Sequence, residues 1–463
     1  MEFALNYKLY DNESKVRSEG EAKASLDEQY LTLTITFGEP MLFSYTDIIG
    51  ISDYDYNIDL FLNSREKLNL WGLGYHYEDF LFQLFKLRNE LFLKYLLIEE
   101  SLFQAGFEGR YIQLDQNGQT NQTGNCEIRL YETALVVLPQ KNEPIRLPYC
   151  YMTTLNKQDY KITITNDSQG KTEFTQLGQN FDPFAKALSD AINKMILRTQ
   201  QNIKELIPEA TPITITKLAA LMKDGQAAKR ELIEQQSIDF WRRLTKKIDE
   251  AGLTTEYGFL YSIAAKGQVC LGIKRGLMGD LTGTYIWILF PLLNPGTNRL
   301  SNTIALEAFN TQDNLEENKT QPKNKDSEVQ EDLHQNGVEE PKKGSTGATY
   351  FFKAVRRKEY AQTKDEDLSK ELESFIKNFN RSMIEINFRR EPIYLTENQL
   401  ESTQYTQYRF AISKIPSLKA LRDQFIGRVI HASQEQWKAD VISLLAFNTK
   451  SIDDTEKWSK GDQ

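Results

Sequence analysis

Cysteine and histidine are scarce in this chain of 463 residues. Its three cysteines and three histidines are Cys126, Cys150, Cys270, His76, His334 and His431. They are scattered, and no CxxC, HExxH, P-loop or GxGxxG pattern occurs, so the residues that usually hold a metal or a phosphate are not grouped. Lone cysteines are more often small buried apolar residues than nucleophiles. The sequence therefore predicts no catalytic residue, no metal site and no cofactor.

An excess of positive charge is missing as well. The 56 Lys and Arg residues are outnumbered by 65 Asp and Glu residues, which gives a formal net charge of −9. A protein that wraps nucleic acid usually has a basic domain or stripe. Nucleic acid is therefore not an expected partner.

Long apolar runs are absent too. The most apolar stretch, TYIWILFPLL from Thr284, is much shorter than the roughly 20 residues that span a bilayer. The N-terminal MEFALNYKLYDNES has neither a basic segment nor a long apolar one, so it does not resemble a secretory signal. A small, odd number of cysteines fits a reducing compartment. We expect a soluble, cytoplasmic protein.

What the chain does have is a long internal repeat. EPMLFSYTDIIGISDYDYNIDL begins at Glu39, and the similar EPIRLPYCYMTTLNKQDYKITI begins 104 residues later, at Glu143. Residue identities at this offset continue without a gap from Phe3 to Asn89. They include Phe3 with Phe107, Tyr7 with Tyr111, Gly20 with Gly124, Asp55 with Asp159, Tyr56 with Tyr160, and Phe80 with Phe184. A period of this length is too long for a solenoid, so each copy should be a whole domain.

Each copy predicts several strands followed by one helix. In the first copy EFALNYKLYD, AKASLDEQYLTLTI, MLFSYTDIIGI, YNIDLFL and KLNLW read as strands. Apolar residues then recur at helical spacing, at Phe80, Leu84, Leu87, Leu91 and Tyr95. The helix of the second copy is expected to have Asp182 as its cap and Pro183 in its first position. Most residues shared by the copies are interpreted as core and turn residues.

Residues 1–205 resemble the pleckstrin-homology (PH) superfamily, in particular its GRAM-like and bacterial PH-like branches. The hairpin ASLDEQYLTLTI, the strand FSYTDIIGI, YNIDLFL and the closing helix carry the resemblance, and the second copy repeats it. The resemblance implies two PH-like bent β-sheets, at residues 1–103 and 104–208, each closed by a C-terminal helix. It also implies peptide binding along a sheet edge and the flank of that helix.

The first hairpin is the place where phosphoinositide-binding PH domains carry basic residues. In the first copy Lys15, Arg17 and Lys23 are the candidates for an anion- or lipid-binding site, but glutamates are interleaved with them. The matching loop of the second copy is neutral or acidic until Arg129. A headgroup site and ordinary solvated loop charges both stay open as interpretations.

The second half of the chain predicts helices and then a third domain. Residues 209–254 read as a helical linker, with a short helix ending at Gly225 and a longer one whose stripe would be Leu232, Ile238, Trp241 and Leu244. Residues 255–450 should form an α+β domain, followed by a flexible tail at 451–463. Residues 311–347 have no aromatic side chain and few aliphatic ones, which predicts a disordered insert. The predicted fold class of the whole chain is α+β.

Individual segments of the third domain are assigned from their local patterns. YGFLYSIAAKGQVCLGIKRGLMGDLTGTYIWILFPLL from Tyr257 is expected to form several strands and tight turns. NTIALEAF, ATYFFKAV, EPIYL from Glu391 and YRFAISKI from Tyr408 are also expected to be strands. DEDLSKELESFIKNFNRSMIEINF, PSLKALRDQFIGRVIH and SQEQWKADVISLLAF are expected to be helices, the last one capped by Ser433.

A basic patch is the second candidate site. In ATYFFKAVRRKEY, Lys353, Arg356, Arg357 and Lys358 adjoin three aromatic residues. Interleaved basic and aromatic residues are a feature of nucleic-acid binding. On a strand, however, the aromatic residues would point into the core and the basic residues would face water. Anion binding and simple solvation both stay open for this patch.

The leading hypothesis is a non-catalytic scaffold whose tandem PH-like domains bind a protein or peptide partner. One alternative is a peripheral membrane protein that binds anionic lipid through the first copy. Another is an enzyme with its site in the C-terminal domain. A chromatin-type chaperone is a further alternative, which rests on analogy of fold alone.

Overall fold

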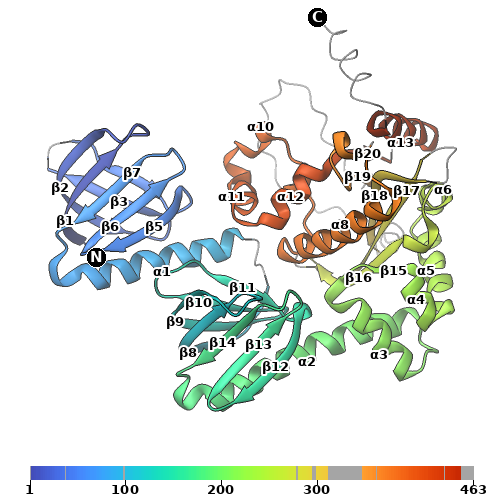
Figure 1. The fold of residues 1–463 in the computed structure, drawn as a ribbon, viewed down its shortest axis with the longest axis horizontal. Helices are drawn as coiled ribbons and strands as arrows, with labels where there is room; N and C mark the ends of the chain where they lie inside the picture. The colour runs from blue at the N-terminus through green and yellow to red at the C-terminus, as the bar shows by residue number, and fades with distance from the viewer. Residues whose placement is uncertain are drawn as a thin grey trace, which may run out of the picture. The chain divides into compact units, whose positions relative to one another are not determined.

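The computed structural model describes residues 2–36, 38–96, 100–277, 280–294, 299–310, 347–360, 362–431 and 433–449 (Figure 1). The chain forms two compact units, Met1–Met195 with Asn398–Lys414, and Ile196–Glu397 with Ile415–Gln463. The predicted insert at 311–347, except Gly347, and the predicted tail at 451–463 lie outside the described residues. The domain boundaries given above stay predictions.

The first repeat is a seven-stranded antiparallel sheet followed by a helix. Its elements are β1 (Glu2–Tyr10), β2 (Val16–Leu26), β3 (Tyr30–Ile35), β4 (Met41–Ser44), β5 (Ile48–Tyr54), β6 (Asn57–Leu62), β7 (Lys67–Trp71) and α1 (Tyr77–Tyr95). The strand order is β4-β3-β2-β1-β7-β6-β5. Strands β4 and β5 are therefore the edges of this sheet.

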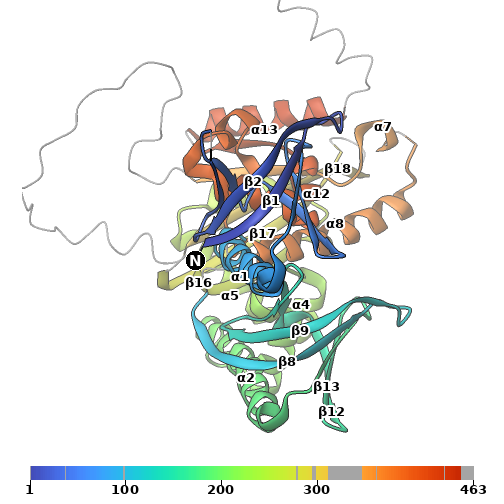
Figure 2. The ribbon, with the colours of Figure 1, turned by 90° about the vertical axis from the view of Figure 1, so that its left-hand side faces the viewer.

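The second repeat has the same plan. Its elements are β8 (Leu102–Leu114), β9 (Thr120–Tyr131), β10 (Ala134–Pro139), β11 (Ile145–Pro148), β12 (Met152–Gln158), β13 (Lys161–Asn166), β14 (Lys171–Thr175) and α2 (Phe181–Leu206). The order β11-β10-β9-β8-β14-β13-β12 matches that of the first sheet strand for strand. Figure 2 shows the curvature of the long hairpins β1–β2 and β8–β9. In β8–β9 the register shifts at three places, and such irregularities bend a sheet.

Alternating apolar residues explain why these segments are strands with one buried face. In β1 the residues Phe3, Leu5, Tyr7 and Leu9 are buried, and the residues between them are not. The helix of each repeat then covers that face. Phe80 of α1 contacts Phe3 with ring centroids 5.2 Å apart. The matching rings of the second repeat, Phe184 and Phe107, are also 5.2 Å apart.

The hairpin turn between β5 and β6 has the same backbone conformation as the turn between β12 and β13. Asp55 and Tyr56 both have positive φ, 45° and 58°, and Asp159 and Tyr160 have 51° and 55°. Two successive left-handed residues make the tight hairpin turn whose twist matches the strands. The exposed ring of Tyr56 lies 5.3 Å from Tyr77, the first residue of α1. This contact ties the hairpin to the helix.

The other unit contains a six-stranded sheet of order β15-β16-β17-β18-β19-β20. Its strands are β15 (Ala228–Lys229), β16 (Cys270–Leu277), β17 (Asp280–Leu293), β18 (Leu300–Asn310), β19 (Ala348–Lys353) and β20 (Phe425–Ile430). Its helices are α3 (Pro212–Leu221), α4 (Arg230–Gln236), α5 (Ile238–Glu250), α6 (Thr254–Ser262), α7 (Arg357–Tyr360), α8 (Asp365–Glu385), α9 (Glu391–Tyr394), α12 (Pro416–Gln424) and α13 (Gln434–Thr449). A core that includes Trp241, Leu244, Phe290, Phe351 and Trp437 joins the sheet to helices α3, α4, α5, α6 and α13. The fold is thus α+β, with curled antiparallel sheets and helices, as predicted.

Three predicted strands are helical. EPIYL forms α9 because Pro392 lies at its first turn, where proline is favoured. YRFAISKI is part of α11 (Thr406–Lys414), and its buried residues Tyr408 and Ala411 are three apart, the spacing of a helix. The beginning of YGFLYSIAA lies in α6, which ends at Ser262.

Two predicted helices differ from expectation in their extent. PSLKALRDQFIGRVIH divides into α12 and β20, because Phe425–Ile430 pairs with β19. The long linker helix is interrupted at Ser237, whose Oγ accepts from Phe240 N (3.3 Å) and caps a new helix. Its expected stripe is wrong for Leu232 and Ile238, which are 41% and 69% exposed.

The sequence also predicts the residues that begin helices α2 and α13. Helix α2 begins at Phe181, directly after a 3₁₀ turn at Gly178–Asn180, so Asp182 lies in its first turn and is not the cap. Pro183 is tolerated there because the first N–H groups of a helix have no partner within it. The predicted Ser433 cap is confirmed, since Gln436 N donates to Ser433 Oγ (3.2 Å).

Candidate interaction site

The predicted anion-binding residues of the first hairpin each lie beside a carboxylate. Lys15 pairs with Glu13 at 2.6 Å, Arg17 with Glu66 at 2.7 Å and Lys23 with Glu2 at 3.6 Å. Arg17 and Lys23 are six residues apart on β2, a separation of about 20 Å along a strand. The structure therefore does not gather the three into one cluster, and their role in lipid binding stays a prediction.

The predicted basic patch lies at the end of β19 and the start of α7. Lys353 is partly buried and Arg356 is exposed, while the side chains of Arg357 and Lys358 lie outside the described residues. The neighbouring rings of Tyr350, Phe351 and Phe352 are buried. These rings belong to the core of the sheet, so they do not offer a stacking surface for bases. Anion binding by the patch stays a prediction.

The cysteines are buried, which agrees with a packing role. Burial raises the pKa of Cys126 to about 12, and burial also raises the pKa of Cys270 to about 12. A thiol with so high a pKa is not ionised near neutral pH. Among the residues that the structure describes, no group of three or more His, Cys, Asp and Glu is placed to hold a metal ion. No helix in the same residues has the length and apolar character needed to cross a membrane.

The residues that join the two repeats were missed by the sequence reasoning. Helix α1 serves both of them: Phe80 and Leu84 lie in the core of the first repeat. Farther along the helix, Leu93 packs against Val136 and Leu138 of the second repeat. The polar residues between these two apolar ends, Arg88 and Asn89, are almost fully buried.

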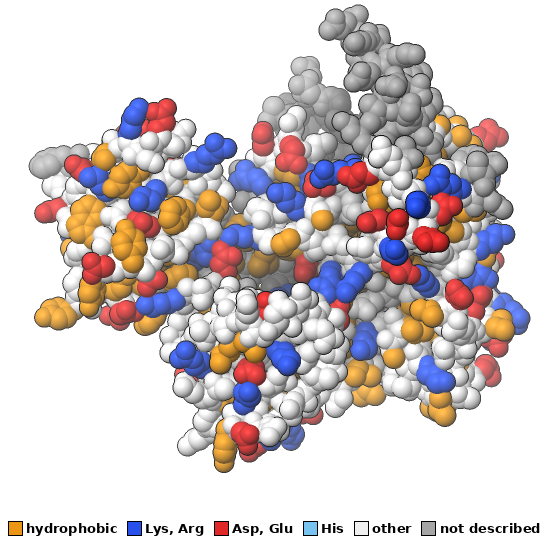
Figure 3. Space-filling view, viewed as in Figure 1, with side chains coloured by type: hydrophobic (Ala, Val, Ile, Leu, Met, Phe, Trp, Pro, Cys, Tyr) orange, Lys and Arg blue, Asp and Glu red, His pale blue; other side chains and the backbone are white. Residues whose placement is uncertain are grey.

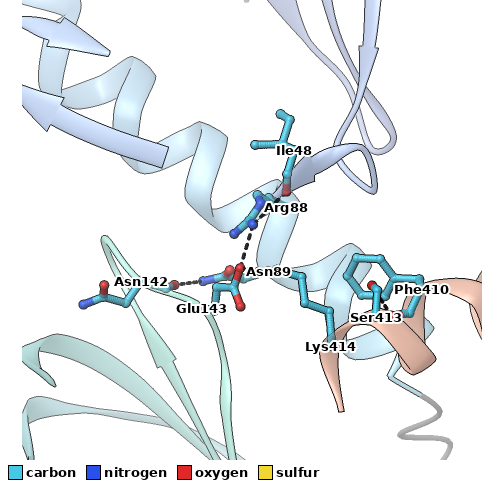
Figure 4. Close-up of polar contacts among 8 residues, drawn as sticks. All are labelled: Ile48, Arg88, Asn89, Asn142, Glu143, Phe410, Ser413 and Lys414. Carbon is cyan, nitrogen blue, oxygen red and sulfur yellow. Dashed lines mark hydrogen bonds and ion pairs between the residues drawn. The ribbon is translucent and has the colours of Figure 1, made fainter. Parts of the chain in front are cut away.

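Arg88 and Asn89 bind the segment that follows β10 (Figure 4). Arg88 donates one hydrogen bond to the Ile48 carbonyl (3.0 Å) and another to Glu143 Oε1 (2.8 Å). The Asn89 amide donates to the carbonyl oxygens of Pro139 (3.2 Å) and Asn142 (2.9 Å). We name residues 140–144 the β10–β11 loop.

Lys141 of the same loop lies between two carboxylates of the first repeat. Its Nζ is 3.2 Å from Asp53 Oδ2 and 3.3 Å from Glu78 Oε2. It also lies 5.6 Å from the centre of the Phe82 ring, a cation–π geometry. We name five residues of the first repeat that contact the loop or the end of β10, Asp53, Glu78, Phe82, Arg88 and Asn89, the α1–β5 face.

A segment from much later in the chain completes this junction. Lys414, the last residue of α11, donates to Glu143 Oε1 at 2.6 Å. Phe410 of the same helix packs on Phe92 of α1, with ring centroids 4.4 Å apart. Glu143 therefore accepts hydrogen bonds from two cations, Arg88 and Lys414.

The charges at this junction stabilise one another. Burial raises the pKa of Glu143, but the hydrogen bonds and charges of Lys414 and Arg88 outweigh burial and leave that pKa below its ordinary value. Burial lowers the pKa of Arg88, and Glu143 offsets part of that effect. Burial also lowers the pKa of Lys141, but Asp53 and Glu78 outweigh it, so the pKa of Lys141 is raised. Glu143 and Lys141 are therefore ionised at neutral pH, and a guanidinium such as that of Arg88 keeps its proton in proteins.

The matching positions of the second repeat have different chemistry. At the offset of 104 residues, Asp53, Glu78, Phe82, Arg88 and Asn89 correspond to Lys157, Asp182, Lys186, Ile192 and Asn193. Lys157 and Asp182 form an ion pair with each other. Asn193 is exposed, whereas Asn89 is 2% exposed. We name this set the α2–β12 face.

Edge strand β12, beside that face, is also exposed. Every residue from Thr153 to Gln158 has an exposed side chain, and β12 pairs only with β13 in the sheet. In β5, the matching edge strand of the first repeat, Gly50 and Ile51 are partly buried. The backbone groups along the outer side of β12 have no strand partner within the sheet.

A second polar cluster lies in the other unit, among β18, β19 and α13. Buried Thr349 donates to Glu307 and accepts from Trp437 Nε1 (2.9 Å). His431 Nε2 lies 3.2 Å from Glu307 Oε1 and 3.1 Å from Thr349 Oγ1. Thr349 is 0% exposed, so its hydroxyl does not face solvent.

Comparison with known proteins finds no family, whereas solved structures do show similarity. No protein-family model and no curated protein matches this chain. The solved structure "Structure of the Spt16D Pob3N heterodimer" is similar over 36% of this chain and 83% of its own, at 13% identity and a TM-score of 0.14. At that TM-score the similarity supports no functional conclusion.

Proposed function

We propose that this protein is a non-catalytic interaction scaffold, and that its two N-terminal repeats are PH-like domains that offer a sheet edge to a protein partner. The observation that carries the proposal is the exposed edge strand β12 beside the α2–β12 face. A partner strand added to β12 would satisfy the outer backbone groups by main-chain hydrogen bonds. Side chains on α2 would then supply specificity.

The α2–β12 face has polar side chains suited to such a partner. Lys186 and Asn193 are exposed on α2, and Lys157 pairs with Asp182 at the start of the helix. Leu155, which is 38% exposed, offers an apolar contact in the middle of β12. The first repeat differs, because its corresponding face is covered by the β10–β11 loop.

Proline substitutions in β12 test the proposal. At two adjacent strand positions, Thr154 and Leu155, one backbone N–H points toward β13 and the other points away from the sheet. Proline at the outward position removes a donor that only a partner strand would use. We expect Thr154→Pro or Leu155→Pro, whichever faces outward, to lose the stoichiometric protein that copurifies with the full chain while its melting temperature stays unchanged.

The matched controls are Gly50→Pro and Ile51→Pro, which lie at the same positions of the first repeat. The outward-facing control should keep the partner. Retention of the partner by both β12 variants would contradict strand addition at this edge. Copurification of no protein at all would contradict the scaffold function itself.

A further inference from the structure

The first repeat has an incomplete arrangement of charges when it is considered without the loop. In the second repeat the facing residues Lys157 and Asp182 have opposite charges and pair with each other. At the same two positions the first repeat has Asp53 and Glu78, which repel each other. Lys141 lies between them and pairs with both, which offsets this repulsion.

The two repeats also differ in charge at the buried end of the α1–β5 face. Where the second repeat has Ile192, the first has Arg88, which is 1% exposed. A buried guanidinium without a carboxylate is strongly unfavourable, and the Ile48 carbonyl alone does not neutralise it. Glu143 supplies the anion. The face therefore favours a cation at its exposed end and needs an anion at its buried end.

The contacts with the loop define what kind of segment fits. Two are made by side chains, those of Lys141 and Glu143, which are two residues apart. Two more are made by the backbone carbonyls of Asn142 and of Pro139, the last residue of β10, which accept from the Asn89 amide and exist in any sequence. The recognised pattern is thus a bent segment, with lysine followed two residues later by an acidic residue.

We infer that the α1–β5 face is a second binding site for a protein segment with this lysine-x-acid pattern, and that the chain's own β10–β11 loop occupies it. The inference rests on the proposed scaffold function and assigns a partner chemistry to its first repeat. The side chains of Lys141, Asp53 and Glu78 are 36%, 34% and 55% exposed. Ion pairs between side chains this exposed contribute little to stability. Exchange at the Lys141 end therefore costs little, whereas at the other end a partner must bring its own carboxylate to the buried Arg88 before Glu143 is released.

Occupation by the loop sets the threshold for that partner. A tethered segment competes at an effective concentration that is on the order of millimolar for short connections. A free segment with the same contacts would bind the resting chain weakly. A change that loosens the loop would expose the face, and the site would then bind at lower concentration.

The first test uses a labelled peptide, LPQKNEPI, which repeats residues 138–145. Fluorescence anisotropy measures its binding to the full wild-type chain and to the variant Lys141→Ser with Glu143→Ser. We expect the variant to bind at least about tenfold more tightly than wild type. The charge-swapped peptide LPQENKPI should not bind either protein. Equal binding of peptide by both proteins, or equal binding of both peptides by the variant, would overturn the inference.

Two further arms keep the result interpretable. Adding Asp53→Asn and Glu78→Gln to the double variant should abolish peptide binding, and both residues are exposed, so the fold should persist. If the double variant does not fold, hydrogen exchange of the wild-type chain decides the question. Millimolar LPQKNEPI should speed exchange within the β10–β11 loop, and LPQENKPI should not. No change with either peptide would contradict displacement of the loop.

These tests are separable from those of the proposed function. The peptide experiments leave β12 unaltered, and the β12 proline variants leave the α1–β5 face unaltered. Failure of the peptide to bind would leave partner binding at β12 standing. Loss of the scaffold function would appear in the β12 variants and in the copurification experiment.

Discussion

At the scale of the residue, Arg88 determines how the two repeats meet. It is almost fully buried on α1, yet it binds the Ile48 carbonyl of its own repeat and Glu143 of the next. A signal for it exists in the sequence, because Arg88 lies four residues after Leu84, on the apolar stripe of the helix. An ionised residue on that stripe requires a partner, but nothing local in the sequence identifies Glu143 or Lys414 as that partner.

We expect Glu143→Gln to destabilise the first unit. Removal of one partner from a buried ion pair costs about 3–5 kcal/mol. Glu143 is 41% exposed, so solvent screening reduces the expected loss to about 2 kcal/mol. The measurement is the midpoint of urea unfolding, followed by a probe in the first unit.

The matched control for this variant is Glu39→Gln. Glu39 is the residue of the first repeat that corresponds to Glu143, and it is exposed. Its substitution should leave the midpoint unchanged. A shift as large as that of Glu143→Gln would mean that the Arg88 pair is not the cause.

His431 should make the stability of the other unit depend on pH. Burial lowers its pKa, but the hydrogen bond and charge of Glu307, with the charge of Glu256, outweigh burial and raise it above 6.5. A raised pKa in the folded state adds stability that is full below the unfolded pKa and is lost as pH rises through the folded pKa. The destabilisation caused by His431→Gln should therefore be larger near pH 5.5 than near pH 8.5.

Thermal unfolding of wild type and His431→Gln at the two pH values checks this prediction. The groups around the ring are Glu307, Glu256, Thr349 and Trp437. A difference in melting temperature that is constant with pH would show that the ring contributes only packing.

At the scale of the element, much of the fold follows from the sequence. In both repeats apolar residues alternate along the strands and recur at helical spacing in the closing helices. These two patterns predict the secondary structure. Short aromatic segments are harder, since YRFAISKI alternates like a strand although its buried residues Tyr408 and Ala411 have helical spacing. The packing of this segment against the first unit could not be predicted either. Helix α11 belongs with the first unit, far from it in sequence, and no local pattern encodes so distant a contact.

Phe410 should anchor α11 in that unit. It is 4% exposed and contacts both Phe92 and Tyr95. Phe410→Ala removes a buried ring, a change that usually costs about 3–5 kcal/mol. We expect faster hydrogen exchange in Thr406–Lys414, measured by mass spectrometry. Phe410→Leu should have a smaller effect, and protection that is unchanged in Phe410→Ala would show that α11 is held by Lys414 instead.

At the scale of the whole molecule, duplication has produced two copies with one scaffold and different surfaces. The shared residues are mostly in the core and turns, such as Phe80 and Phe184, whereas the faces beside the edge strands differ in charge. Figure 3 shows hydrophobic side chains among charged ones over the first repeat, which lies at the left as in Figure 1. Tyr54, Tyr56 and Tyr75 of that repeat are 51%, 71% and 105% exposed.

The lipid-binding alternative and the scaffold proposal predict opposite results for binding to anionic vesicles. Salt-sensitive binding to phosphatidylserine vesicles, abolished by changing Lys15, Arg17 and Lys23 to Glu, would support a headgroup site. Because each of the three pairs with a carboxylate, we expect neither wild type nor the triple variant to sediment with vesicles. Sedimentation of wild type alone would favour the lipid site.

The most direct test of the scaffold account is hydrogen exchange of the full chain with and without its copurified partner. Strand addition forms new main-chain hydrogen bonds, so the amides of β12 (Met152–Gln158) should become protected, together with the exposed side of α2. Protection of β12 at a stoichiometry of one partner per chain is the predicted result. Protection confined to other strands, with β12 exchanging as before, would contradict the account.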